Sequence, residues 1–489
     1  MDSAIISAAD AGKDIVLTGN PGDGKTHIIR MMKSRLEELG KPIEIVLDAS
    51  TLSNTEIYEK WVSARNEGKV YVIAINAAVL YSVYREHSDF APIANAYRLM
   101  ASSVVFHNES DSPSDIIVFD LSKREILTPE ILTQAIKKLT DSEHYQECDH
   151  CPLRNDCDVT RNRILLNGPL FQERLSVILE RVALKGYHAT LRELQSFIAY
   201  LILGNRSCKK LSQTAGNDNY DICNLVYSGK GDLFVAIRAS IDPIRISHPV
   251  WDERIIQNDI EPESWTDGYK IPAEAIAFDN DGLFRLRKRQ FYFFNAHGDE
   301  LLKILDDEAS RFQSFLLQDD KKTKKELFHK INTFFGSAKP SNTEIQIWTG
   351  HRFDNEPRKV LISIGAQKAS SFEIGKPALQ ADMQTGIDMT SNYIRLEKKN
   401  ARGIFLKIDF DMYLLLSEAE RGVPVLFLES DLVKKVWRFI EQLQSFNAIE
   451  DENAEISLMD VQNKKRINVT IDREDNKYTA IRSIRTEEA

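Results

Sequence analysis

The sequence has few of the features that mark secreted, membrane-spanning or strongly basic proteins. Its 489 residues contain five cysteines, too few for a disulfide framework in a chain of this length. No apolar run reaches the roughly 18 residues of a spanning helix, and the first residues lack the basic and apolar segments of a signal peptide. A net charge of −10 excludes a broad positive surface, so any nucleic-acid binding requires a local basic patch. We therefore expect a cytoplasmic protein with reduced thiols and no membrane association.

One motif dominates what is present. The stretch GNPGDGKT, from Gly19 to Thr26, matches G-x-x-x-x-G-K-[ST] at every fixed position and lies between an apolar run and a helical pattern. In a phosphate-binding loop of this kind, backbone N–H groups surround phosphate oxygens, Lys25 reaches the β- and γ-phosphates, and Thr26 contacts Mg²⁺. We therefore predict that the chain binds ATP and Mg²⁺. The predicted nucleotide-binding residues are Gly19, Asn20, Pro21, Gly22, Asp23, Gly24, Lys25, Thr26 and His27.

Around this motif, strand-like and helical segments alternate. Amphipathic segments at 27–40 and 55–68 predict helices, each ending at a glycine. Near-continuous apolar runs predict strands at 14–19, 43–50, 70–76 and 115–122. Apolar strands joined by helices are typical of a mostly parallel sheet with helices on both faces. The predicted fold class is therefore α/β, a P-loop NTPase of ASCE or AAA-like type.

Hydrolysis requires a carboxylate at a strand end to hold Mg²⁺. Asp48 and Asp120 both end apolar strands, although such aspartates also commonly cap a following helix. Asp48 is preferred because the next strand ends in Asn76, and an asparagine at that place senses the γ-phosphate in the ASCE class. Against this, Asp48 follows the glycine-rich loop after only one helix, earlier in the chain than the acidic residue of that class usually lies. Neither aspartate precedes the usual glutamate base, so the sequence gives little sign of fast hydrolysis. The predicted catalytic residues are Lys25, Asp48, Asn76 and Asp120, with Thr26 and Asp48 on Mg²⁺.

A second cluster lies in HYQECDHCPLRNDC, which arranges three cysteines as C-x₂-C-x₅-C. Two thiolates two residues apart can chelate one tetrahedral ion from a single turn, and a third closes the loop. Zinc is preferred to an iron–sulfur cluster because nothing indicates redox chemistry, and free surface thiols are the other interpretation. The predicted ligands are Cys148, Cys151, Cys157 and, as first choice for the fourth, Cys208, with His150 and His144 as alternatives.

Two further features concern charge. The run RLRKRQFYFF combines four cations with four aromatic residues, which suits DNA contact through phosphates and stacked bases. It equally suits an amphipathic element with buried aromatics. Arg192 follows the nucleotide-binding region on a predicted helix and is either a γ-phosphate contact or a solvated residue. No nuclease, H-E-x-x-H or G-x-S-x-G motif occurs. The candidate DNA-contacting residues are Arg285, Arg287, Lys288 and Arg289.

The remainder of the chain suggests a division into several domains. After two runs with strand character near 344–350 and 359–365, the last part contains helices, one of them at 431–445, and a strand near 466–471. The predicted domains are a P-loop NTPase core (1–127), a helical region with a Cys-rich metal-binding knuckle (128–225), a mainly helical domain with the basic run (226–335), and an α+β C-terminal domain (336–489).

Several stretches together resemble a family of bacterial anti-phage defence ATPases, the ATPase-like factors of DNA phosphorothioation-dependent restriction. They are GNPGDGKTHII, LDAS with IAINAAVL, CDHCPLRNDC, HATLRELQSFIAYLILG, LRKRQFYFF and IDFDMYLLLSEAERGVP. The resemblance implies an ATPase that acts as a motor or switch for partner proteins on DNA. Ala77 and Ala78 depart from the more polar loop expected there. The alternative is a nucleotide-binding scaffold that assembles a defence complex with little turnover. A homo- or hetero-oligomer is expected, as AAA-type ATPases often form rings.

Overall fold

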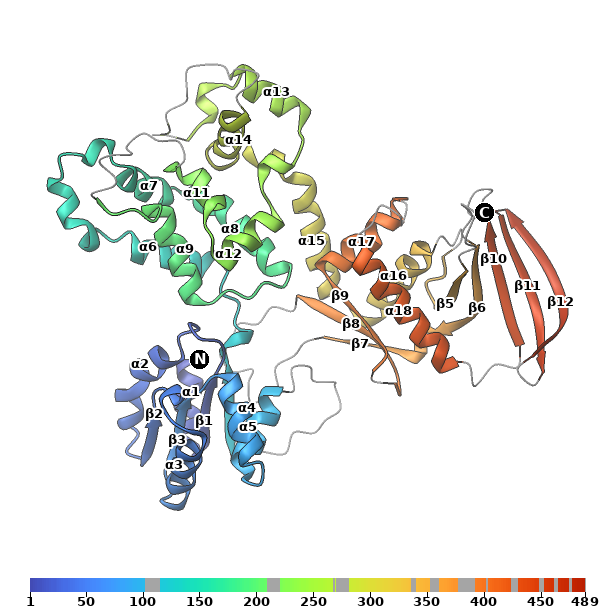
Figure 1. The fold of residues 1–489 in the computed structure, drawn as a ribbon, viewed down its shortest axis with the longest axis horizontal. Helices are drawn as coiled ribbons and strands as arrows, with labels where there is room; N and C mark the ends of the chain where they lie inside the picture. The colour runs from blue at the N-terminus through green and yellow to red at the C-terminus, as the bar shows by residue number, and fades with distance from the viewer. Residues whose placement is uncertain are drawn as a thin grey trace. The chain divides into compact units, whose positions relative to one another are not determined.

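The computed structural model describes residues 1–101, 115–208, 220–266, 269, 281–335, 340–351, 360–376, 392–401, 403–423, 430–447, 453–460, 465–474 and 477–488 (Figure 1). The described residues up to 307 form one compact unit, and those from 308 onward form a second. No helix in the described ranges is long and apolar enough to cross a membrane.

The first unit begins with a four-stranded sheet in the order β2-β3-β1-β4, in which every pairing is parallel. This agrees with the predicted α/β class and with all four predicted strands. The strands are β1 (Asp14–Thr18), β2 (Ile43–Val46), β3 (Val70–Ala74) and β4 (Ile116–Asp120). The helices of this part are α1 (Asp2–Asp10), α2 (Lys25–Glu37), α3 (Asn54–Asn66), α4 (Ala77–Glu86) and α5 (Ala91–Ala101).

Helices cover both faces of this sheet, as the apolar strands predict. Successive residues of a strand point to opposite faces, so Val16 of β1 belongs to one core with α3, α4 and α5. Its neighbours Ile15 and Leu17 belong to the other core, with α1 and α2. All five residues of β1 are buried. The central strand is therefore held rigidly, and so is the loop that leaves its carboxyl end.

The rest of the first unit is helical and shares one hydrophobic core, whose residues run from Ile126 to Leu302. This core includes residues on both sides of the predicted domain boundary between 225 and 226. Its α-helices are α6 (Pro129–Leu139), α7 (Asp158–Leu166), α8 (Pro169–Leu184), α9 (Leu191–Leu203), α11 (Ile222–Ser228), α12 (Asp232–Ser240), α13 (Pro249–Gln257) and α14 (Asp281–Phe294). The short helical turns η3 (Ser142–His150) and η4 (Arg154–Asp156) connect α6 to α7. The predicted helical character of this part is confirmed.

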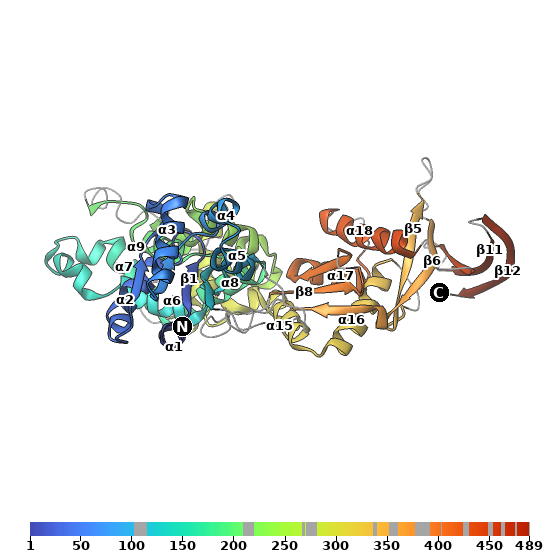
Figure 2. The ribbon, with the colours of Figure 1, turned by 90° about the horizontal axis from the view of Figure 1, so that it is seen from below.

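The second unit combines helices with two antiparallel sheets, ordered β12-β11-β10-β6-β5 and β7-β8-β9. Figure 2 shows the long, curved β11 and β12. Helix α18 buries Leu432, Val436, Ile440 and Leu443, which recur every three or four residues and so share one face of the helix. The helices are α15 (Lys303–Leu317), α16 (Asp320–Phe334), α17 (Phe410–Glu420) and α18 (Ser430–Asn447). The strands are β5 (Glu344–His351), β6 (Val360–Lys368), β7 (Phe372–Gly375), β8 (Tyr393–Lys398), β9 (Phe405–Asp409), β10 (Asn453–Asp460), β11 (Lys465–Glu474) and β12 (Lys477–Glu488).

Candidate functional site

The glycine-rich loop, residues 19–26, leaves β1 and leads directly into α2, which begins at Lys25. The Lys25 ammonium is buried and donates hydrogen bonds to the carbonyl oxygens of Gly19, at 3.0 Å, and Asn20, at 2.7 Å. Burial lowers the pKa of Lys25, against the opposing influence of the nearby carboxylates. The backbone N–H of Asn20 donates to the carboxylate of Asp23 at 2.6 Å. The loop therefore closes around the ammonium of Lys25, which its carbonyl oxygens hold.

Two glycines in the loop are required by geometry. Gly24 caps α2 with a φ of 93°, a left-handed backbone conformation that residues with a side chain rarely adopt. Gly22 has a φ of 106°, and a Cβ atom there would lie 3.1 Å from the Cβ of Arg192 and 3.2 Å from the Oγ1 of Thr190. The loop thus needs glycine both for its turn and for the close approach of the segment that starts α9.

A cavity of about 640 Å³ lies beside this loop, within the size range of small-molecule sites. We call it the loop cavity. Its lining comes from the loop, from α2, from the carboxyl ends of β2 and β3, and from α6 and α9 of the helical part. The lining residues are Pro21, Gly22, Gly24, Lys25, Thr26, His27, Arg30, Asp48, Ser50, Asn76, Lys138, Leu191, Arg192 and Gln195.

The two candidate aspartates differ in position, although each caps a short helical turn. Asp48 follows β2, lines the loop cavity and is exposed. The hydroxyl of Ser50 donates to its carboxylate at 2.6 Å and the Ser50 backbone N–H at 2.9 Å, and these bonds lower the pKa of Asp48. Asp120 ends β4, is buried, and accepts the same two bonds from Ser122. It is absent from the described lining of the cavity, which makes Asp48 the better-placed Mg²⁺ candidate.

Asn76 follows β3, the strand between β1 and β2. The backbone N–H of Ile75 donates to the carbonyl of Leu17 at 2.9 Å, so Asn76 lies beside the point where β1 passes into the glycine-rich loop. Asn76 is half-buried, caps α4 through its backbone, and lines the loop cavity with Asp48. Adjacent parallel strands thus bring these two predicted residues to one edge of the sheet.

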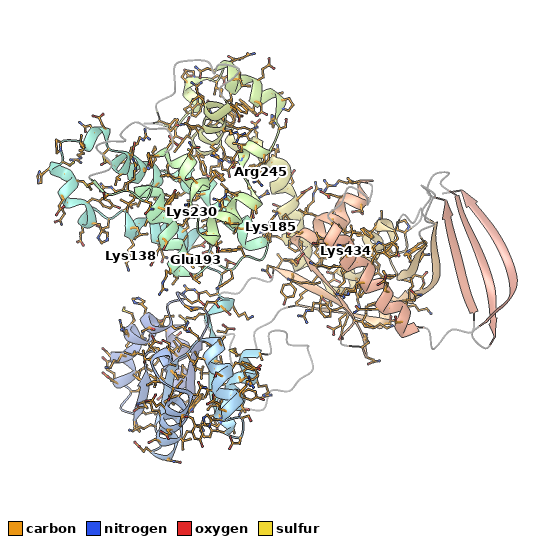
Figure 3. The ribbon with its side chains drawn as sticks, in the orientation of Figure 1. Lys138, Lys185, Glu193, Lys230, Arg245 and Lys434 are labelled. Atoms are coloured by element: carbon orange, nitrogen blue, oxygen red, sulfur yellow. The ribbon has the colours of Figure 1, made fainter. Side chains whose placement is uncertain are left out.

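The opposite wall of the cavity is formed by the helical part. The backbone N–H of Arg192 approaches the carbonyl of Gly22 at 3.4 Å, and Arg192 lines the cavity from the first turn of α9. A capping box between Thr190 and Glu193 fixes that turn. Lys138 joins the lining from α6, and Figure 3 shows Lys138 and Glu193 at the same end of the helical part. Arg192 is exposed and also lines the cavity, so its position is compatible with both interpretations, the γ-phosphate contact and the solvated residue.

Sequence patterns singled out the loop, Asp48, Asn76 and Arg192 but missed other residues of the lining. Lys138 and Gln195 lie on the helical part, and Arg30 lies on α2 one turn beyond Thr26. The spacing of Arg30 could have identified it, because residues four apart on a helix share a face. Lys138 carries no local signal, since it reaches the cavity through the packing of α6 against α9.

His188 links the helical part to the loop electrostatically, with its Nε2 atom 3.7 Å from the buried Asp23 carboxylate. The neighbouring Asp23 raises the pKa of His188 above its ordinary value of 6.5, against the opposing effect of burial. The charges of Glu125 and Asp120 act in the same direction as Asp23. Protonated His188 therefore stabilises the folded loop, and this contribution disappears as pH rises.

The pair of His188 and Asp23 predicts that the free energy of unfolding depends on pH. Because the folded-state pKa of His188 is raised, its stabilisation is complete below the unfolded pKa and is lost as pH rises through the folded pKa. His188→Gln should therefore lower the free energy of unfolding more at about pH 6 than at about pH 8. Urea denaturation of both proteins at the two pH values tests this. An equal loss at both would show that His188 acts through packing.

The cysteine cluster lies away from the loop cavity. Cys148, Cys151 and Cys157 are half-buried free thiols along the η3–η4 connection, and Cys208 is exposed just after α9. Burial raises the pKa of Cys148, and the thiols of Cys157, Cys208 and Cys151 raise it further. The alternative ligands His144 and His150 are exposed on η3. Within the described residues, no three ligand-type side chains are close enough to form a ready-made metal site.

Most of the basic run is buried or half-buried. It lies on α14, where Lys288 is 2% exposed and pairs with Asp252. Arg289 pairs with the buried Asp242 at 2.6 Å. Arg287 is also buried, as are the four aromatic residues Phe291, Tyr292, Phe293 and Phe294. Arg285 alone of the four cations is exposed, beside Asp281. Lys288 and Arg289 thus form ion pairs beside an aromatic core, which favours the second interpretation of the run, an amphipathic element with buried aromatics.

Comparison of the chain with protein-family models, curated proteins and solved structures finds no match in any of the three. The resemblance to defence ATPases therefore stays a prediction from sequence motifs.

Proposed function

We propose that the chain is a P-loop ATPase that binds ATP with Mg²⁺ in the loop cavity. Lys25 would exchange its bonds to the Gly19 and Asn20 carbonyls for the β- and γ-phosphates, and the loop N–H groups would hold the remaining phosphate oxygens. Thr26 and Asp48 would hold Mg²⁺, Asp48 directly or through water. Asn76, at the end of the intervening strand, would contact the γ-phosphate or the attacking water.

The observation that carries this proposal is the charge of the cavity. Its lining includes four basic side chains, Lys25, Arg30, Lys138 and Arg192, and among the described lining residues Asp48 is the sole carboxylate. Such an excess of positive charge in a chain of net charge −10 suits a polyanion. A carboxylate beside the Lys–Thr pair adds a place for a hard cation. Together these features match a Mg²⁺–triphosphate better than a simple anion.

One observation favours slow turnover. A catalytic glutamate is expected after the acidic residue, but Ala49 and Leu121 occupy those positions and both are buried. The described lining offers no second carboxylate to activate water. We therefore propose a nucleotide-dependent switch with slow hydrolysis. In line with its motif resemblance, it would work with partner proteins of a defence complex on DNA, and a scaffold with negligible turnover is the second candidate.

Steady-state hydrolysis separates these two candidates. The switch predicts a measurable Mg²⁺-dependent release of phosphate that rises when DNA and partner proteins are added. The scaffold predicts tight ATP binding with turnover no faster than that of Lys25→Ala. Because Arg287 and Lys288 of the basic run are buried, the assay includes DNA with and without partner proteins, which separates direct stimulation from stimulation through a partner.

Arg192 and Lys138 should distinguish ATP from ADP. Both face the cavity from the helical part, so their removal should weaken ATP binding by about tenfold each and ADP binding less, if they contact the γ-phosphate. Competition titrations with both nucleotides measure this for Arg192→Ala and Lys138→Ala. Lys137→Ala is the matched control, because Lys137 is an exposed neighbour on α6 outside the described lining. Equal losses for ATP and ADP would place both cations away from the γ-phosphate.

A further inference from the structure

The connection between α6 and α7 consists of tight turns, and its apolar anchors, Tyr145 and Cys157, are only partly buried against the helical core. The Cys151 N–H donates to the Cys148 carbonyl at 3.2 Å, and the Arg154 N–H donates to the Cys151 carbonyl at 3.1 Å. No residue of η3 or η4 is buried. Burial of apolar side chains is the usual source of stability for such turns, and small segments that lack it commonly depend on a cross-link or a metal.

The fourth cysteine is brought to this connection by a buried ion pair. Arg206 and Asp158 lie 3.1 Å apart, with exposed side-chain fractions of 4% and 3%. Asn162 of α7 also donates to the carbonyl of Leu201 in α9. Cys157 directly precedes Asp158, and Cys208 follows Arg206 by two residues. The start of α7 and the end of α9 are therefore fixed together, with a thiol on each.

We propose that Cys148, Cys151, Cys157 and Cys208 together bind one structural zinc ion. The turns η3 and η4 contact each other, and η4 contacts α7, so the first three cysteines lie on one short packed stretch. Tetrahedral coordination by four thiolates is a common form of structural zinc site, and a pair two residues apart supplies two ligands from one turn. Among the described residues the sulfur atoms do not form a ready-made metal site, so the proposed binding requires Cys208 and the turns to move closer together. Each ligating thiol gives its proton to solvent.

This assignment gives the zinc a structural role in the helical part. It would fasten the partly buried α6–α7 connection to the segment after α9, the helix whose first turn contributes Arg192 to the loop cavity. The metal lies outside the described cavity lining, so the site is independent of nucleotide binding: either proposal can fail while the other holds.

Elemental analysis of the purified full-length chain tests the proposal. We expect about one zinc per chain in the wild type. Cys148→Ser and Cys151→Ser should lose the metal. Cys223→Ala should keep it, because Cys223 is the fifth cysteine and is buried on α11 in the helical core. Wild-type protein without zinc, zinc retained by the cluster variants, or iron with acid-labile sulfide would each overturn the assignment.

A measurement on the wild type avoids variants that fail to fold. Titration of native protein with p-hydroxymercuribenzoate, with a metallochromic indicator present, should release zinc as the four cluster thiols react, while buried Cys223 remains unmodified. Release of zinc without thiol modification would contradict thiolate ligation. For the fourth ligand, Cys208→Ser should weaken zinc binding in chelator competition and His150→Asn should not. The reverse result would identify His150, and not Cys208, as the fourth zinc ligand.

Discussion

Asp48→Asn is expected to suppress ATP hydrolysis by on the order of 10²-fold while preserving metal-free nucleotide binding. The substitution keeps the shape of the side chain and its ability to accept the bonds from Ser50. It removes the negative charge, and with it the ligand that Mg²⁺ prefers. Phosphate release with Mg²⁺ and nucleotide affinity in EDTA measure the two effects separately.

Asp120→Asn is the matched control, because Asp120 makes the same two bonds with Ser122 on the other side of β1. As a cap of a short turn, it should cost about 1 kcal/mol of stability at most and leave hydrolysis near the wild-type rate. If the larger loss of hydrolysis falls on Asp120→Asn, then β4 and not β2 carries the acidic residue. Small and equal losses of hydrolysis in the two variants would exclude both aspartates as the Mg²⁺ ligand.

Lys25→Ala should weaken ATP binding by about 10- to 150-fold, the range expected when hydrogen bonds from a charged group to a phosphate are lost. The effect has two sources. The ammonium is the buried cation of the loop, and its bonds to Gly19 and Asn20 hold the loop closed. Equilibrium titration with a fluorescent ATP analogue gives the affinity.

Lys33→Ala serves as the control for that variant. Lys33 lies on the same helix, two turns further on, is about half exposed, and pairs only loosely with Glu37 at 3.8 Å. Its removal changes net charge by the same amount and should leave affinity unchanged. Similar losses in both variants would mean that the nucleotide responds to overall charge, and the Lys25 contact would have to be abandoned.

The parts of the fold that follow from local patterns were predicted well. The four parallel strands are short apolar runs, of which β1, β3 and β4 are buried along their whole length and β2 is mostly half-buried, so their sequence indicates both their position and their environment. The glycine-rich loop was recognisable because glycine, lysine and threonine occur at fixed spacing between a strand and a helix. Asp48 and Asn76 were identifiable because neighbouring parallel strands end at one edge.

What depends on packing between distant segments was not predictable. Lys138 and the contact of Arg192 with Gly22 exist because α6 and α9 fold back onto the loop. The antiparallel sheet of β7, β8 and β9 was missed, since its short strands lie in a part where helices were expected. The run on α14 could not be assigned from composition, because cations beside aromatics suit both a nucleic-acid surface and the buried ion pairs that Lys288 and Arg289 form.

Calorimetric titration of the wild-type chain with ATP, in the presence and absence of Mg²⁺, tests the central claim most directly. The cavity has one glycine-rich loop, one Lys–Thr pair and one adjacent carboxylate. We therefore predict about one ATP per chain, with an affinity that increases when Mg²⁺ is present. The absence of saturable binding under both conditions, or binding that is indifferent to both Mg²⁺ and the loss of Lys25, would contradict the proposed ATPase site.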